Sequence, residues 1–214
     1  IRAGVAGLTA ASMRIGVFGG TFDPPHVGHL ILAEECRTQL NLDKLLWVVT
    51  DNPPHKRYVN ISPIESRVQL VLKAIEGNPA FELSRVDIDR PGPHFAIDTV
   101  NILKQQFPGS HIFYLMGGDS LHDLPTWIKP RDFVNLCDGI GVMRRHADQV
   151  DLDSLDLLLP GIKAKALIVE APILEISSHQ IRQRIHDKQG YRYYLREAVY
   201  QAIDDMGLYQ GEII

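Results

Sequence analysis

Residues 15–30 read IGVFGGTFDPPHVGHL, and this stretch decides how the rest of the chain is interpreted. Its first four residues form a short apolar run that predicts a buried strand. A turn with two glycines follows, and the sequence HVGH at 26–29 opens a helical pattern. Such a turn builds an anion site, because glycine permits close backbone approach and the first N–H groups of a helix are free. His26 and His29 share one helix face, where both rings could bind phosphoryl oxygens and, if protonated, offset developing charge.

Length and composition predict an ordinary globular protein. The chain has 214 residues, of which 45% are hydrophobic and 22% are charged, which favours one domain with a sizeable core. A net charge of −4 without any basic block argues against a nucleic-acid partner. Cys36 and Cys137 lack metal-ligand spacing and are expected to be reduced core residues. No apolar run is long enough to span a membrane, so we expect a cytoplasmic protein without a membrane partner.

Strand-like and helix-like segments alternate along the chain. This alternation predicts an α/β fold with a Rossmann-like parallel sheet and helices on both faces. Further strands are expected at 44–50, 81–88, 111–116, 139–145 and 166–170. Ser62 is expected to cap the helix that follows it, with Glu65 completing a capping box. Residues 1–12 are expected to be a cloning remnant or an extended start, and residues 13–214 a single domain.

A second candidate anion site lies near the end of the chain, where residues 176–182 read ISSHQIR. Ser177 and Ser178 are good helix caps, and capping alone would explain them. Arg182 lies one turn further, on the side of the cap. Serine hydroxyls, free N–H groups and a guanidinium would then converge on one anion.

Three other segments place polar residues after predicted strands, where α/β sheets bind ligands. Lys56 belongs to a cationic cluster after the second strand, which composition alone would explain as a solvated loop. Asp119 and Ser120 follow a glycine pair, where the carboxylate could contact a ribose hydroxyl or cap a helix. Arg144 ends the fifth predicted strand and could equally be solvated.

Taken together, residues 15–30 resemble the GxFDPxHxGH signature of the nucleotidyltransferase superfamily. The GGTFDP form followed by His26 is most similar to the bacterial nicotinate-mononucleotide adenylyltransferase family. ISSHQIR resembles the superfamily's ISSTxIR motif, with His179 in place of the usual Thr, and the resemblance extends from Met13 to Tyr209. It implies adenylyl transfer from ATP to nicotinate mononucleotide with release of pyrophosphate, a step of NAD biosynthesis.

The resemblance also implies roles for individual residues. Phosphate groups would be held by His26, His29 and Arg182, and Mg²⁺ would bridge phosphates mainly through water, without a protein carboxylate cage. Nicotinate would bind between Trp127, which would stack on its ring, and the backbone of Phe95 and Ala96, where the family usually has Thr at the second position. Lys56 would approach the mononucleotide phosphate. ATP contacts are expected from Gly19, Gly20, Thr21, Phe22, Asp119, Ser120, Arg144, Ile176, Ser177 and Ser178.

Alternative functions remain at this point. The same chemistry could act on nicotinamide mononucleotide or another phosphorylated cofactor precursor. A class I aminoacyl-tRNA synthetase fragment fits less well, since KMSKS is missing and the charge is acidic. The third alternative is a non-catalytic nucleotide-binding regulator. The absence of a GxGxxG motif after the first strand argues against a nicotinamide-dependent dehydrogenase. The oligomeric state stays open, with a homo-oligomer possible.

Overall fold

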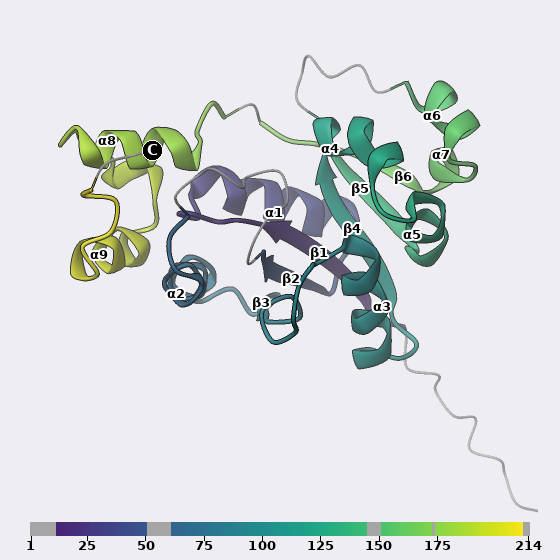
Figure 1. Cartoon of the computed structure of the whole chain (residues 1–214), viewed down its shortest axis with the longest axis horizontal. Coiled ribbons are helices and arrows are strands. Elements are labelled where there is room, and N and C mark those ends of the chain that lie inside the picture. Colours follow the sequence, from purple (N-terminus) through teal and green to yellow (C-terminus); the bar gives the residue numbers. More distant parts are fainter. Residues whose placement is uncertain (1–11, 51–60, 145–150, 173, 212–214) are drawn as a thin grey trace, which may run out of the picture.

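The fold is built on a parallel sheet of six strands in the order β3-β2-β1-β4-β5-β6 (Figure 1). The structure is a computed structural model that describes residues 12–50, 61–144, 151–172 and 174–211. Every neighbouring pair of strands is parallel. The strands are β1 (Arg14–Gly20), β2 (Lys44–Val49), β3 (Phe81–Ser84), β4 (His111–Gly117), β5 (Gly139–Arg144) and β6 (Ala166–Glu170).

The strand order places the switch point of the sheet at β1. Strand β1 pairs with β2 on one side and β4 on the other, so the winding direction reverses there. In open α/β sheets, ligands bind beyond the carboxyl ends of the strands at this point. The predicted glycine turn therefore leaves the sheet where a ligand site is expected.

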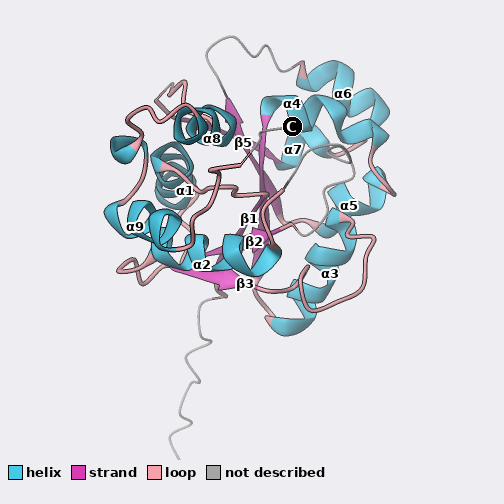
Figure 2. Cartoon of the chain, turned by 60° about the vertical axis from the view of Figure 1, so that its left-hand side comes forward, coloured by secondary structure: helices cyan, strands magenta, loops and turns pink. Residues whose placement is uncertain are grey.

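Helices cover both faces of the sheet (Figure 2). One face carries α1 (Val27–Gln39), α2 (Ile64–Ile75), α8 (Ser178–His186) and α9 (Glu197–Asp205). The other carries α3 (Ala96–Gln106), α4 (Gly118–Asp123), α5 (Pro130–Leu136), α6 (Leu152–Leu158) and α7 (Ile162–Lys165). Short 3-10 helices, η1 (Leu124–Thr126) and η2 (Arg192–Tyr194), complete the described elements. The predicted α/β class, parallel sheet and two helical layers are confirmed.

Each face of the sheet has its own apolar core. One cluster packs around Trp47, and the other packs around Phe133. The sequence KLLWVV of β2 is almost wholly buried because both of its faces are covered. Cys36 and Cys137 are buried and unpaired, one in each core, and burial raises the pKa of both thiols to about 12. Within the described residues, no helix has the length and apolar character needed to cross a membrane.

Two local predictions are wrong in detail. Strand β3 ends at Ser84 rather than at Ile88, because residues 85–89 turn back so that Ile88 and Asp89 donate backbone hydrogen bonds to Arg85. Ser62 does not cap α2. The helix begins at Ile64 with Pro63 at the cap position, and the backbone N–H of Ser62 instead donates to the Asp23 carboxylate.

Candidate active site

The loop between β1 and α1 is folded around the Phe22 ring. Phe22 has a positive φ of 48° and its ring is buried against Phe18 and Trp47. A Cβ at Gly20 would lie 2.7 Å from that ring, which explains the glycine without any ligand. Close approach of a ligand to the Gly20 backbone stays a prediction. Gly19 also faces the protein, with Tyr114 Oη 3.4 Å from the position of its Cβ.

The two histidines of the first motif lie together at the start of α1. Their ring centroids are 3.7 Å apart. The backbone N–H of His26 donates to Nδ1 of His29 over 3.2 Å. Because Nδ1 accepts this bond, the ring proton of neutral His29 lies on Nε2, which can donate to a phosphoryl oxygen.

His26 differs from its neighbour because it is buried. It is 6% exposed, and burial lowers its pKa to about 4. Its Nδ1 has no hydrogen-bond partner in the described structure, and Gly28 leaves it room: a Cβ there would lie 3.0 Å from that atom. This lowered pKa favours the neutral form of His26 near pH 7, so positive charge is not expected from this ring, while its contact with phosphoryl oxygens stays a prediction. The His26 ring packs against that of His29.

The lowered pKa of His26 predicts a pH-dependent stability. The unfolded chain gains a proton at this residue below about pH 6.5, whereas the folded chain does so only near pH 4. The free energy of unfolding should therefore fall as the pH drops through this window, by about 3 kcal/mol in total. Urea unfolding at several pH values, compared with His26→Gln, measures this loss. Exposed His122 offers the control His122→Gln, which should keep the wild-type slope. Parallel curves for His26→Gln and wild type would contradict the assignment.

The two sequence motifs are in direct contact. Arg182 Nη1 donates to the backbone carbonyl of Asp23 over 2.7 Å, and Ser178 Oγ donates to that of Pro24 over 2.8 Å. The other N–H groups of Arg182 have no partner in the described part of the chain. The start of α8 is thus attached to the loop before α1, although more than 150 residues separate them.

These contacts enclose a small cleft of about 100 Å³ at the carboxyl end of β1. His29 and Arg182 line it from opposite motifs, so an imidazole and a guanidinium face the same space. Its lining consists of Thr21, Phe22, Asp23, His29, Ile61, Ser178 and Arg182. Three predicted positions of the first motif and two of the second therefore line one cleft, whereas buried His26 does not line it.

The remaining residues of the second motif have other surroundings. The Ser177 hydroxyl accepts from Gln180 N over 3.2 Å, and the Gln180 side chain accepts from Ser177 N, so Ser177 completes a capping box. Ile176 packs against the core beside Gly28. His179 lines a separate hollow with Gln183 and Tyr194. The departure from Thr at position 179 therefore lies on a different helix face from Ser178 and Arg182.

The predicted nicotinate-binding residues lie on the opposite face of the sheet. Phe95 is the N-cap of α3, and the first hydrogen bonds of that helix come from Asp98 and Thr99. The backbone N–H groups of Ala96 and the next residue therefore precede the first helical hydrogen bonds of α3. At this helix N-terminus they could donate to a carboxylate. Trp127 follows η1, is half-buried, and packs edge-on against Tyr114. Ala96 and Trp127 border the same core cluster.

The other predicted ligand contacts lie at the same edge of the sheet or outside the described residues. Asp119 is exposed in the first turn of α4, directly after β4, but it is not the helix cap, since Gly117 takes that position. Ser120 follows it in α4. Arg144 ends β5, and its side chain is outside the described structure. Lys56 falls within residues 51–60, which are also outside it.

Sequence reasoning missed a buried arginine beneath the cleft. Arg67 of α2 is 1% exposed and donates to three backbone carbonyls, those of Ser62, Thr21 and Thr50. These carbonyls belong to the segments that follow β1 and β2 and precede α2. A helical arginine gives no local sign of such contacts, because two of these partners lie 17 and 46 residues away.

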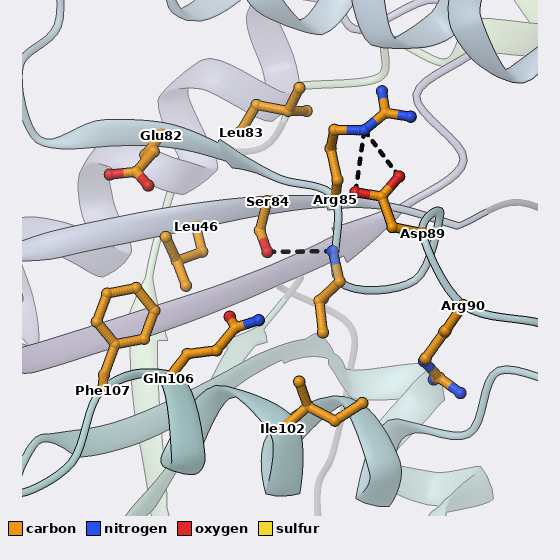
Figure 3. Close-up of a pocket in the computed structure, with 11 residues that line it drawn as sticks. Leu46, Glu82, Leu83, Ser84, Arg85, Asp89, Arg90, Ile102, Gln106 and Phe107 are labelled. Carbon is orange, nitrogen blue, oxygen red and sulfur yellow. Dashed lines mark hydrogen bonds and ion pairs between the residues drawn. The ribbon is translucent and has the colours of Figure 1, made fainter.

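A hollow of about 380 Å³ elsewhere contains none of the predicted site residues (Figure 3). It lies between β3 and α3, and its charged groups are paired, as in Arg85 with Asp89. Among the described residues, no group of three or more His, Cys, Asp or Glu side chains could hold a metal ion.

The sequence is similar to those of known nucleotidyltransferases. The Cytidylyltransferase-like family matches residues 17–184. A probable nicotinate-nucleotide adenylyltransferase of Thermomicrobium roseum is 38% identical over 197 residues, covering 92% of each chain. Nicotinate-nucleotide adenylyltransferase of Bacillus subtilis is 35% identical over 202 residues, covering 92% of this chain and 99% of that one.

Solved structures show the same fold. Plasmodium falciparum nicotinic acid mononucleotide adenylyltransferase complexed with NaAD has a TM-score of 0.75 at 17% identity, covering 94% of this chain and 98% of that one. The same enzyme complexed with APC has a TM-score of 0.74. With the matches in sequence, these findings show that the chain belongs to the nicotinate-nucleotide adenylyltransferases of the Cytidylyltransferase-like family.

Proposed function

We propose that this protein transfers the adenylyl group of ATP to nicotinate mononucleotide, giving nicotinate adenine dinucleotide and pyrophosphate. The observation that carries the proposal is the cleft in which His29 and Arg182 meet at the switch point of the sheet. Family membership supports the reaction class, and the N-terminus of α3 supports a carboxylate on the acceptor.

The reaction needs no nucleophilic side chain. The acceptor phosphate is already ionised, so its oxygen can attack the α-phosphorus of ATP in line while the bond to pyrophosphate breaks. His29 would donate from Nε2 to the α-phosphate, and Arg182 would bind the β- and γ-phosphates beside Ser178, whose hydroxyl donates to the Pro24 carbonyl. Catalysis would then come from positioning and from stabilising charge on the phosphoryl oxygens.

Mg²⁺ fits this proposal as a partner of ATP rather than as a resident ion. The described residues offer it no carboxylate cluster, so phosphate oxygens and water would supply most of its ligands. When bound, it would neutralise phosphate charge beside Arg182. A cytoplasmic location is part of the same proposal, since the substrates are metabolites of the cell interior.

The first test is pyrophosphate release with ATP, Mg²⁺ and nicotinate mononucleotide, run beside nicotinamide mononucleotide. We expect rapid release with the acid and little with the amide, because the N–H groups at Ala96 favour a carboxylate over a carboxamide. Equal release with both acceptors would contradict the acceptor assignment. No release with either would contradict the reaction and leave the nucleotide-binding regulator.

A further inference from the structure

A hydrogen bond joins the C-terminal segment to the active-site loop. After α9, Tyr209 turns with a positive φ of 64° and its ring packs against the core. Its hydroxyl donates to Oδ1 of Asp23 over 2.7 Å. These residues are 186 positions apart in the sequence, so the contact exists only in the folded chain.

Asp23 connects three parts of the site. Asp23 is 3% exposed, and its carboxylate accepts from Tyr209 at Oδ1 and from Ser62 N at Oδ2, the latter over 3.1 Å. Its backbone carbonyl accepts from Arg182. The guanidinium of Arg182 therefore lies beside a buried carboxylate but bonds to the carbonyl of that residue.

This arrangement leaves Arg182 available to a ligand. A buried carboxylate oxygen that loses its donor must find another, and Arg182, which already donates to the backbone carbonyl of Asp23, offers a charged donor. If the Tyr209 hydroxyl were absent, the Asp23 carboxylate would turn to Arg182 and form an ion pair with it. That ion pair would compete directly with nucleotide phosphate for the guanidinium.

We propose that Tyr209 is a positioning residue: its hydroxyl holds the Asp23 carboxylate so that Arg182 stays available to the phosphates of ATP. The inference rests on the proposed function, since it takes ATP as the ligand of Arg182. Burial and the neighbouring carboxylate both raise the pKa of Tyr209 above its ordinary value. The phenol therefore remains a donor throughout the neutral pH range.

The experiment compares Tyr209→Phe with Tyr200→Phe. Tyr200 belongs to the same C-terminal unit, on α9, and its hydroxyl has no hydrogen bond within the described structure. We expect Tyr209→Phe to weaken ATP binding by roughly tenfold, in both the Kd without acceptor and the KM, the size of one hydrogen bond to a charged group. Thermal unfolding should be close to that of Tyr200→Phe.

The Asp23→Asn background tests whether the charge of the Asp23 carboxylate is what attracts Arg182. In Asp23→Asn the neutral amide no longer attracts Arg182, so adding Tyr209→Phe should change ATP affinity little. A full tenfold loss of ATP affinity in the Asp23→Asn background would overturn the proposal. So would a Tyr209→Phe single variant that binds ATP as tightly as Tyr200→Phe, or one that does not fold. Because ATP affinity is measured without acceptor, a wild-type chain that binds ATP but releases no pyrophosphate would contradict the proposed function alone.

Discussion

Replacing His29 by Ala should lower kcat by about a hundredfold or more, because loss of one donor to developing charge costs roughly 2.7–4 kcal/mol in the barrier. His29 is the imidazole that lines the cleft, and its Nε2 carries the proton that it would donate. Steady-state pyrophosphate release at saturating substrates measures the effect. His122→Ala is the matched control, since that side chain is 91% exposed. A near-normal kcat for His29→Ala would remove the residue from the chemistry.

Two further substitutions separate the catalytic role of His29 from its structural one. Asn places an oxygen where Nδ1 lies, so His29→Asn can still accept from His26 N but has no donor at the Nε2 position. Gln places an amide N–H near the Nε2 position and loses the acceptor at Nδ1. We expect His29→Gln to retain more activity than His29→Asn, and His29→Asn to retain more stability. The reverse order of activity would mean that the bond to His26 N, not donation from Nε2, is what the reaction needs.

Arg67→Met should produce the largest loss of stability of any single substitution considered. The aliphatic chain of Met fills much of the same space, but three carbonyls lose their shared donor. Removing one partner of such a buried charged network costs about 3–5 kcal/mol, which corresponds to roughly 10 °C in Tm for a chain of this size. Urea unfolding and thermal unfolding both measure it.

Arg131→Met is the control for Arg67→Met, because Arg131 is exposed near the start of α5. It should stay within about 0.5 kcal/mol of wild type. Arg67→Lys should recover part of the loss, since an ammonium can reach some of the three carbonyls but lacks the planar fork. Equal unfolding free energies for Arg67→Met and Arg131→Met would show that the three contacts contribute nothing.

The elements that local rules govern could be predicted from the sequence. The apolar runs of β1 and β2 have no polar alternation, and this marks strands buried on both faces. The Ser177 cap follows from a local pattern of serine and glutamine. The meeting of the two motifs in one cleft could also be predicted in principle, because the carboxyl ends of parallel strands lie at one edge of the sheet.

What the sequence could not predict depends on distant partners. Ser62 obeys the local capping pattern, yet the adjacent proline and the Asp23 carboxylate change its role. His26 has the same residue type and motif as His29, and only the packing around α1 makes it buried and neutral. Arg67 and Tyr209 show no pattern at all, because their partners lie 46 and 186 residues away.

The division of the molecule by its sheet has a consequence for how such enzymes change during evolution. The histidine and arginine that we propose to bind phosphates belong to the α1 and α8 side, whereas Ala96 and Trp127, the proposed acceptor contacts, belong to the α3 side. With this proposed assignment, a substitution around the start of α3 would alter the acceptor contacts and leave the proposed phosphate contacts on the other face of the sheet in place. Substitutions selected at α3 could therefore change the acceptor while ATP is kept as the adenylyl donor.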